Sequence, residues 1–154
     1  MRRCNKMVKI KKCFFVIFLL SILYFFLNIE FVKVDGESMQ PTLNNNDIVI
    51  YKRNIKNIKR FDIVIFKFNN SLFIKRVIGL PGEKIEYRKN NLYVNGEEVS
   101  ENFKKSVTSD LIVDLIPSNE IFVLGDNRIF SSDSRDFGSV KLSDVKGIMI
   151  LRLT

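Results

Sequence analysis

Beyond residue 30, the apolar residues of this chain occur in short runs rich in Ile, Val and Phe. Each run is bounded by Asn, Asp, Gly or Pro, which commonly end strands. The pattern predicts strands over residues 47–51, 61–68, 71–78, 119–124 and 147–153. No segment there keeps a helical period for three turns. The sequence therefore predicts an all-β domain, with an antiparallel sheet packed or closed on itself like a barrel.

The region between the third and fourth of these strands is less regular. Residues 84–99 alternate imperfectly, with turn signals at 89–91 and 95–96, and predict hairpins. Residues 100–118 are polar and irregular. We expect them to form an excursion over the surface.

A long apolar run precedes the predicted domain. Residues 13–29 contain no charged side chain, which is near the lower length limit for a membrane-spanning helix. The residues that follow offer no pair of small side chains at which a signal sequence could be removed. We therefore expect an uncleaved transmembrane anchor over 13–29 in preference to a cleaved signal, a basic tail over 1–12, and a peptidase-sized domain over 30–154.

The net charge of +8 does not indicate a nucleic-acid-binding surface. Residues 1–12 carry six basic side chains and no acidic one, leaving 19 basic against 17 acidic residues over 13–154. A basic tail before an apolar run predicts a cytoplasmic N-terminus and an extracytoplasmic domain. Both cysteines, Cys4 and Cys13, precede residue 30, so a disulfide framework in the domain is excluded.

Ser38 is the first candidate for chemistry. Alone, such a serine is usually part of a surface turn. Here Gly36 and Pro41 bracket it, as a constrained nucleophile with nearby backbone donors would require. At about 3.5 Å per residue, it lies within about 30 Å of the end of the apolar run. Because the chain contains no histidine, a base for this serine must be another residue, and lysine is the obvious substitute.

Lys75 is the candidate base. It lies beside Arg76 within an apolar run, and strand alternation places the two on opposite faces, each among apolar side chains. A strand lysine usually faces water, yet one of these two cations should be partly buried. Burial lowers a lysine pKa by up to about 3–5 units, which is enough to supply a neutral amine near pH 7. Arg76 stays protonated and cannot do this.

A third cluster spans residues 125–138 and combines Asp and Arg side chains after a predicted strand. A polar loop is one interpretation. A calcium loop is disfavoured because the ligands do not alternate as calcium loops require, and we expect no metal. Such pairing favours a hydrogen-bonded scaffold, from which the hydroxyl of Ser131 or Ser134 could orient a neutral amine.

Four segments resemble, in order, the sequence boxes of bacterial type I signal peptidases of the compact, single-anchor type. They are residues 36–43 (GESMQPTL), 61–64 (FDIV), 75–83 (KRVIGLPGE) and 125–138 (GDNRIFSSDSRDFG). The resemblance implies a membrane-bound Ser–Lys endopeptidase that removes signal peptides from exported preproteins, without a cofactor. It implies Ser38 as nucleophile and Lys75 as general base.

The resemblance also implies supporting roles. The Ser38 N–H would form part of the oxyanion hole, while the family's second donor, often a serine hydroxyl, falls on Gly36. Ser131 would orient the lysine. The residues implied in scaffold ion pairs are Asp126, Arg76, Asp133 and Arg135, with Asp62 in a structural position. The residues implied in substrate pockets that accept Ala-like side chains are Met39, Leu43, Phe73 and Ile74.

Two other functions are compatible with parts of the sequence. A Ser–Lys autoprotease of the repressor-cleaving kind would share the dyad, but the predicted anchor and the lack of a DNA-binding segment argue against it. A membrane-tethered, non-enzymatic β-domain would leave Ser38 and Lys75 incidental. The expected partners are signal-peptide-bearing preproteins and the lipid bilayer of a bacterial cell membrane, with the export channel as a further candidate.

Overall fold

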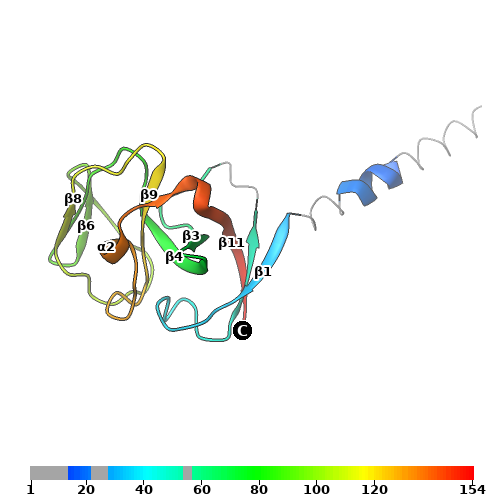
Figure 1. Cartoon of the computed structure of the whole chain (residues 1–154), viewed down its shortest axis with the longest axis horizontal. Coiled ribbons are helices and arrows are strands. Elements are labelled where there is room, and N and C mark those ends of the chain that lie inside the picture. The colour runs from blue at the N-terminus through cyan, green and yellow to red at the C-terminus, as the bar shows by residue number, and fades with distance from the viewer. Residues whose placement is uncertain (1–13, 22–27, 54–56) are drawn as a thin grey trace, which may run out of the picture.

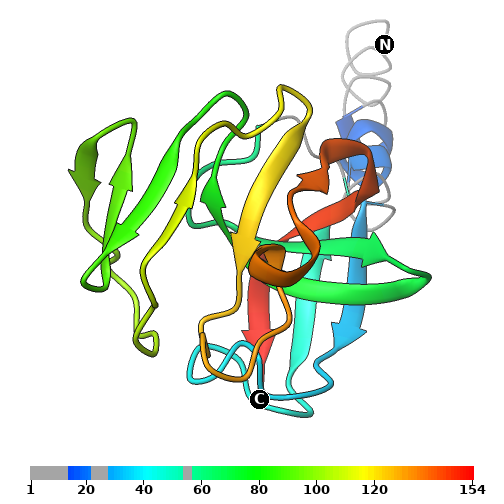
Figure 2. The ribbon, with the colours of Figure 1, turned by 60° about the vertical axis from the view of Figure 1, so that its left-hand side comes forward.

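The computed structural model describes residues 14–21, 28–53 and 57–154, and its folded part consists almost entirely of β-strands (Figure 1). The strands form a seven-stranded and a four-stranded sheet, which lie side by side in Figure 2. Every strand pair is antiparallel. The predicted all-β class is confirmed.

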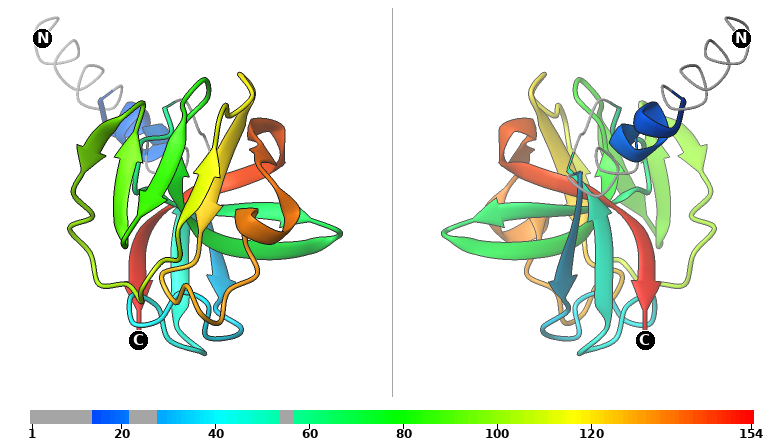
Figure 3. Two further views of the ribbon diagram at one scale, coloured as in Figure 1. Left: turned by 90° about the vertical axis from the view of Figure 1, so that its left-hand side faces the viewer. Right: turned by 90° about the vertical axis from the view of Figure 1, so that its right-hand side faces the viewer.

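The larger sheet has the order β1-β2-β11-β3-β4-β9-β10. Figure 3 shows β1, β2 and β11 running alongside one another, with the green β3–β4 hairpin projecting to one side. In this order the strands are β1 (Ile29–Lys33), β2 (Ile48–Lys52), β11 (Val145–Leu153), β3 (Ile63–Phe68), β4 (Ser71–Gly79), β9 (Glu120–Leu124) and β10 (Val140–Lys141).

The smaller sheet has the order β7-β6-β5-β8. Its strands are β7 (Glu97–Val99), β6 (Asn91–Val94), β5 (Ile85–Arg88) and β8 (Leu111–Val113). The short helix α2 (Ser134–Phe137) and the 3-10 turn η1 (Leu142–Asp144) lie between β9 and β11. Asp133 caps α2 and makes a reciprocal capping box with Asp136.

All five strands predicted from apolar runs are present, with ends shifted by at most two residues. In β2 the alternation buries Val49 and Tyr51, as expected for a strand with one face on the core. The predicted hairpins over 84–99 are also confirmed. Their turns have positive φ at Lys89 and Asn90, and at Asn95 and Gly96, as two-residue hairpin loops require.

Residues 100–118 differ from the expected surface excursion. They include β8, which pairs with β5, and Ile116, whose side chain is fully buried in the core of the smaller sheet. Their polar composition hid this because only a few positions face inward. The prediction was correct for most side chains in the segment but wrong for these.

The strand β1 is also absent from the sequence-based expectations, which assigned Ile29 to the end of the anchor. Here Ile29 pairs with Lys52 of β2. The Tyr51 hydroxyl donates to Glu30, which also forms a 3.1 Å ion pair with Arg53. The start of the domain is thus tied to β2 by polar contacts that no local apolar pattern reveals.

The expected basic tail, residues 1–12, lies outside the described residues, as do Cys13 and residues 22–27 of the expected anchor. Residues 14–21 are helical, and their side chains are exposed. Among the described residues, no helix has both the length and the apolar character needed to cross a bilayer.

Candidate active site

Ser38 lies in the loop between β1 and β2, which two turns hold in place. The Gln40 N–H donates to the Glu37 carbonyl at 3.1 Å, and the Leu43 N–H donates to the Met39 carbonyl at 2.9 Å. The side chains of Met39 and Leu43 are buried in the core beneath the loop. Ser38 therefore sits half-buried on a rigid turn.

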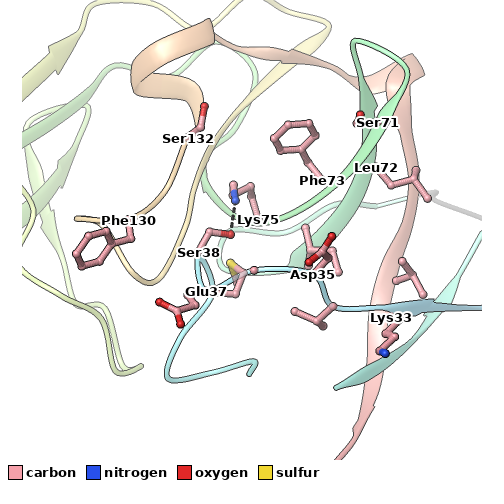
Figure 4. Close-up of a pocket in the computed structure, with 15 residues that line it drawn as sticks. Lys33, Asp35, Glu37, Ser38, Ser71, Leu72, Phe73, Lys75, Phe130 and Ser132 are labelled. Carbon is pink, nitrogen blue, oxygen red and sulfur yellow. Dashed lines mark hydrogen bonds between the residues drawn. The ribbon is translucent and has the colours of Figure 1, made fainter. Parts of the chain in front are cut away.

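Lys75 projects from β4 towards this turn, and its Nζ is 2.6 Å from Ser38 Oγ (Figure 4). The lysine side chain is only 3% exposed. Sequence alternation led us to expect one buried cation of the pair 75 and 76, whereas Arg76 is also buried. Both faces of β4 are covered at this point, so both cations lie inside the protein.

Burial lowers the pKa of Lys75 from its usual 10.5 to about 8, because an ammonium loses its hydration there. The negative charge of Asp133 partly opposes this shift, Arg135 adds to it, and Asp126 opposes it. With a pKa of about 8, roughly one amine in ten is neutral at pH 7, against about four in ten thousand for an ordinary lysine. The site thus contains a hydroxyl hydrogen-bonded to an amine that can act as a base.

The segment 125–138 forms the scaffold behind this pair. Arg76 donates to both carboxylate oxygens of the buried Asp126, at 2.7 and 2.5 Å, and to the Phe61 carbonyl at 3.0 Å. Thr42 also donates to Asp126. These contacts join the Ser38 loop, β4 and the 125–138 segment around one carboxylate.

A second set of ion pairs surrounds Asp133. Arg135 binds both of its carboxylate oxygens at 2.8 Å, and these hydrogen bonds raise the pKa of Arg135. Asp133 also accepts from the Gly125 N–H at 3.0 Å. Asp62 lies apart from these groups and accepts from the Lys59 N–H at 2.8 Å, a turn contact that suits a structural position.

The two serines considered as partners of the lysine have different surroundings. Ser134 Oγ accepts from the Val123 N–H at 2.9 Å, so it serves the backbone of β9. Ser131 Oγ is buried and has no hydrogen-bond partner among the described residues. The expected bond from a serine of this segment to Lys75 is therefore not formed. A methyl group on Gly125 would lie 2.2 Å from Ser131 Oγ and 2.4 Å from the Ser38 carbonyl, so glycine allows the three backbones to meet.

Gly36 has φ +100, a conformation that favours glycine. Its N–H donates to Asn45 Oδ1 at 3.0 Å and so is already used. The Ser38 N–H, in contrast, makes no hydrogen bond to another described residue. Of the two positions considered for an oxyanion hole, only Ser38 offers a free main-chain donor.

A groove of about 420 Å³ runs past the Ser38–Lys75 pair. In Figure 4, Phe73 lies on one side of the pair and Phe130 on the other. The groove is lined by Val32, Lys33, Val34, Asp35, Gly36, Glu37, Ser38, Met39, Ser71, Leu72, Phe73, Ile74, Lys75, Phe130 and Ser132.

Three of the four predicted pocket residues, Met39, Phe73 and Ile74, line this groove. Leu43 does not; it packs in the core behind the loop because the turn at 39–43 directs it inward. Sequence analysis missed Phe130, which lines the groove and is 72% exposed. A large apolar side chain in an otherwise polar loop was the signal for it.

Two strand edges border the groove. β4 pairs with β3 along residues 71–76 but with β9 only at 76–79, and β1 pairs with β2 alone. In the described part of the chain, no strand covers the other edge of β1 or of residues 71–75. We call the gap between residues 32–36 and 71–75 the open seam. An extended peptide could add to either edge there.

Comparisons with known proteins agree with this geometry. Residues 7–154 match the family described as "Signal peptidase, peptidase S26". Signal peptidase I V of Bacillus subtilis (strain 168) is 42% identical over 136 residues, which is 76% of this chain and 81% of that protein. Signal peptidase I of Bacillus caldolyticus is 40% identical over 133 residues, covering 74% of this chain and 73% of its own length.

A solved structure is similar as well. The crystal structure of a signal peptidase I from Enterococcus faecalis V583 has a TM-score of 0.58 and 39% sequence identity, and the match covers 63% of this chain and all of that one. The sequence boxes, the fold and these relatives lead to one conclusion. This chain belongs to the signal peptidase I family.

Proposed function

We propose that this chain removes signal peptides from exported preproteins with a Ser–Lys dyad, in which Ser38 is the nucleophile and Lys75 the general base. Membership of the family supports cleavage of signal peptides by a serine peptidase. The observation that carries the dyad is the 2.6 Å contact between Ser38 Oγ and the buried Lys75 amine. Nucleophile and base at this distance suit proton transfer.

The reaction follows from these two groups. Neutral Lys75 accepts the Ser38 proton as Oγ adds to the carbon of the scissile carbonyl. The ammonium then gives that proton to the leaving amine as the C–N bond breaks, which leaves an ester on Ser38. Water adds to the ester and transfers a proton to Lys75, and Oγ recovers this proton when the signal peptide's carboxyl group departs.

In this mechanism the free Ser38 N–H stabilises the oxyanion. The Gly36 N–H is bonded to Asn45, and a glycine offers no hydroxyl, so the second donor at this position is water or a rearranged main chain. Ser131 orients Lys75: its buried hydroxyl has no other partner, and a small rotation would give it one. The ion pairs of Arg76 with Asp126 and of Arg135 with Asp133 hold the segment that carries it.

The substrate binds in the open seam as an added strand, with main-chain hydrogen bonds to β1 or β4. Met39, Phe73 and Ile74 restrict the side chains that face them to small residues, at the first and third positions before the cut. Residues 13–29 anchor the chain in the bacterial cell membrane with residues 1–12 in the cytoplasm, which would place residues 30–154 next to membrane-tethered preproteins. The export channel is a further candidate partner.

The direct test is cleavage of a preprotein reporter that carries Ala-x-Ala before the cut, by the purified full-length chain in detergent. We expect cleavage after the second alanine. Ser38→Ala should abolish cleavage without changing the melting temperature, because only one half-buried oxygen is lost. An active Ser38→Ala protein, or an inactive wild type that is folded and still binds the reporter, would contradict the proposed function.

The pH dependence of kcat/KM provides a second test. Only the neutral amine can take the serine proton, so kcat/KM should rise about tenfold per pH unit below the Lys75 pKa of about 8 and level off above it. Initial rates on the same reporter between pH 6 and 10 would measure this. A flat profile from pH 6 to 9 would show that this amine is not the base.

A further inference from the structure

The peptide group that joins Glu37 to Ser38 has an unusual partner in Asn127. We propose that Asn127 is a positioning residue that holds the oxyanion-hole donor in place. The inference rests on the proposed function, because it concerns the Ser38 N–H as that donor. It assigns a role to a side chain that touches neither the dyad nor the groove.

Asn127 contacts the nucleophile loop twice. Its side-chain Nδ2 donates to the Glu37 carbonyl at 3.2 Å, and its main-chain N–H donates to the Ser38 carbonyl at 3.0 Å. The Glu37 carbonyl also accepts from the Gln40 N–H at 3.1 Å. Two consecutive carbonyls of the loop are therefore bound by one residue that lies about 90 positions further along the chain.

The first of these contacts fixes the direction of the Ser38 N–H. The Glu37 carbonyl and the Ser38 N–H belong to the same planar peptide group, which is trans, so they point in opposite directions. By holding the carbonyl on its own side, Asn127 turns the N–H away from itself. That N–H has no partner among the described residues and so remains free for a developing negative charge.

The same contact should strengthen the donor. A hydrogen bond accepted by a carbonyl polarises the peptide group and makes its N–H a better donor, as in hydrogen-bonded chains. The oxyanion develops only in the transition state, so this gain raises kcat and leaves ground-state binding unchanged.

The position of Asn127 is itself well defined. On one side, the Asp126 carbonyl accepts from the Ser106 N–H at 3.0 Å, and on the other the buried Arg128 donates to the Gly125 carbonyl at 2.8 Å. The Asn127 carbonyl accepts from the Phe130 N–H at 3.1 Å. These contacts hold the main chain whatever side chain position 127 carries, so a substitution there removes the amide without displacing the loop.

The experiment compares Asn127→Ala with the wild type and with Asn91→Ala, an exposed asparagine of β6 in the other sheet. For each full-length protein in detergent, kcat, KM, the pH profile and the melting temperature are measured on the Ala-x-Ala reporter. Affinity is also measured for a matching peptide aldehyde, to which Ser38 Oγ adds so that the former carbonyl oxygen occupies the oxyanion position.

We expect Asn127→Ala to lower kcat about tenfold, comparable with the loss of one hydrogen bond. Aldehyde affinity should fall by a similar factor, whereas KM, the apparent pKa and the melting temperature stay the same. Asn127→Asp, which has the same shape but places a carboxylate against the Glu37 carbonyl, should be worse. Asn91→Ala should match the wild type throughout.

Two results would overturn the role of Asn127. An unchanged kcat in Asn127→Ala would remove it, as would a kcat that falls only together with the melting temperature, since that would show a purely structural contribution. Neither result affects the dyad, which Ser38→Ala tests separately. Full activity of Ser38→Ala would instead remove the proposed function, whatever position 127 does.

Discussion

Replacing Lys75 with methionine is expected to lower kcat/KM by at least about 10³-fold while making the protein more stable at neutral pH. The loss of activity follows from removal of the only group within hydrogen-bond reach of Ser38 Oγ among the described residues. The gain in stability follows because methionine fills a similar volume without a charge, in a site where the lysine is 3% exposed.

The size and pH dependence of this gain come from the Lys75 pKa. It is about 8 in the folded protein and near 10.5 when exposed. Below pH 8 both states are protonated, and the folded state bears the full cost of a buried ammonium, about 3 kcal/mol. Between pH 8 and 10.5 the folded amine loses its proton while the unfolded one keeps it, so wild-type stability rises with pH.

Urea unfolding of the full-length proteins would measure this effect. Lys75→Met should exceed the wild type by about 2–3 kcal/mol at pH 7, and the difference should shrink towards pH 10. Lys67→Met, at an exposed position on the neighbouring strand β3, should change neither activity nor stability. If Lys75→Met proved less stable than the wild type at pH 7, the lysine would not be the desolvated cation described here.

Arg76→Met is expected to destabilise the domain by about 3–5 kcal/mol, the largest stability loss we predict. It would leave the Asp126 carboxylate buried with only Thr42 as a side-chain partner. It would also remove the guanidinium from above the Phe103 ring, 4.0 Å away, and its hydrogen bond to the Phe61 carbonyl.

The contribution of the stranded charge can be separated by a second substitution. Adding Asp126→Asn to Arg76→Met should recover part of the loss, because a buried amide costs less than an unpaired carboxylate. Arg88→Met, which removes a solvent-exposed ion pair with Glu86, should stay within about 0.5 kcal/mol of the wild type. A loss below about 1 kcal/mol for Arg76→Met would mean that Asp126 is not effectively buried as a charge.

The sequence predicted those features that depend on local pattern. Short apolar runs ending at turn residues located five strands, and the turn residues at 89–91 and 95–96 located two hairpins. Ser38 and Lys75 could be selected because each is conspicuous in its own segment: one lies in a Gly- and Pro-bounded turn, the other within an apolar strand. Their 2.6 Å contact tests a distance, and their catalytic roles stay predictions.

Features that depend on distant partners were not predictable in this way. The strands β1 and β8 exist because β2 and β5 offer them edges, and neither has a strong apolar run of its own. Leu43 looked like a pocket residue until the turn before it directed its side chain into the core. Asn127 gains its importance only through carbonyls that folding brings next to it.

The open seam has a further consequence for the handling of this protein. Unpaired strand edges are where β-proteins stick to one another, and natural folds usually cover or charge them. Here the exposed Phe31 and Leu72 lie on the two strands that border the gap. Purified stocks kept without a bound peptide should therefore be the ones that aggregate, and an uncleavable strand-shaped peptide should act as a preservative.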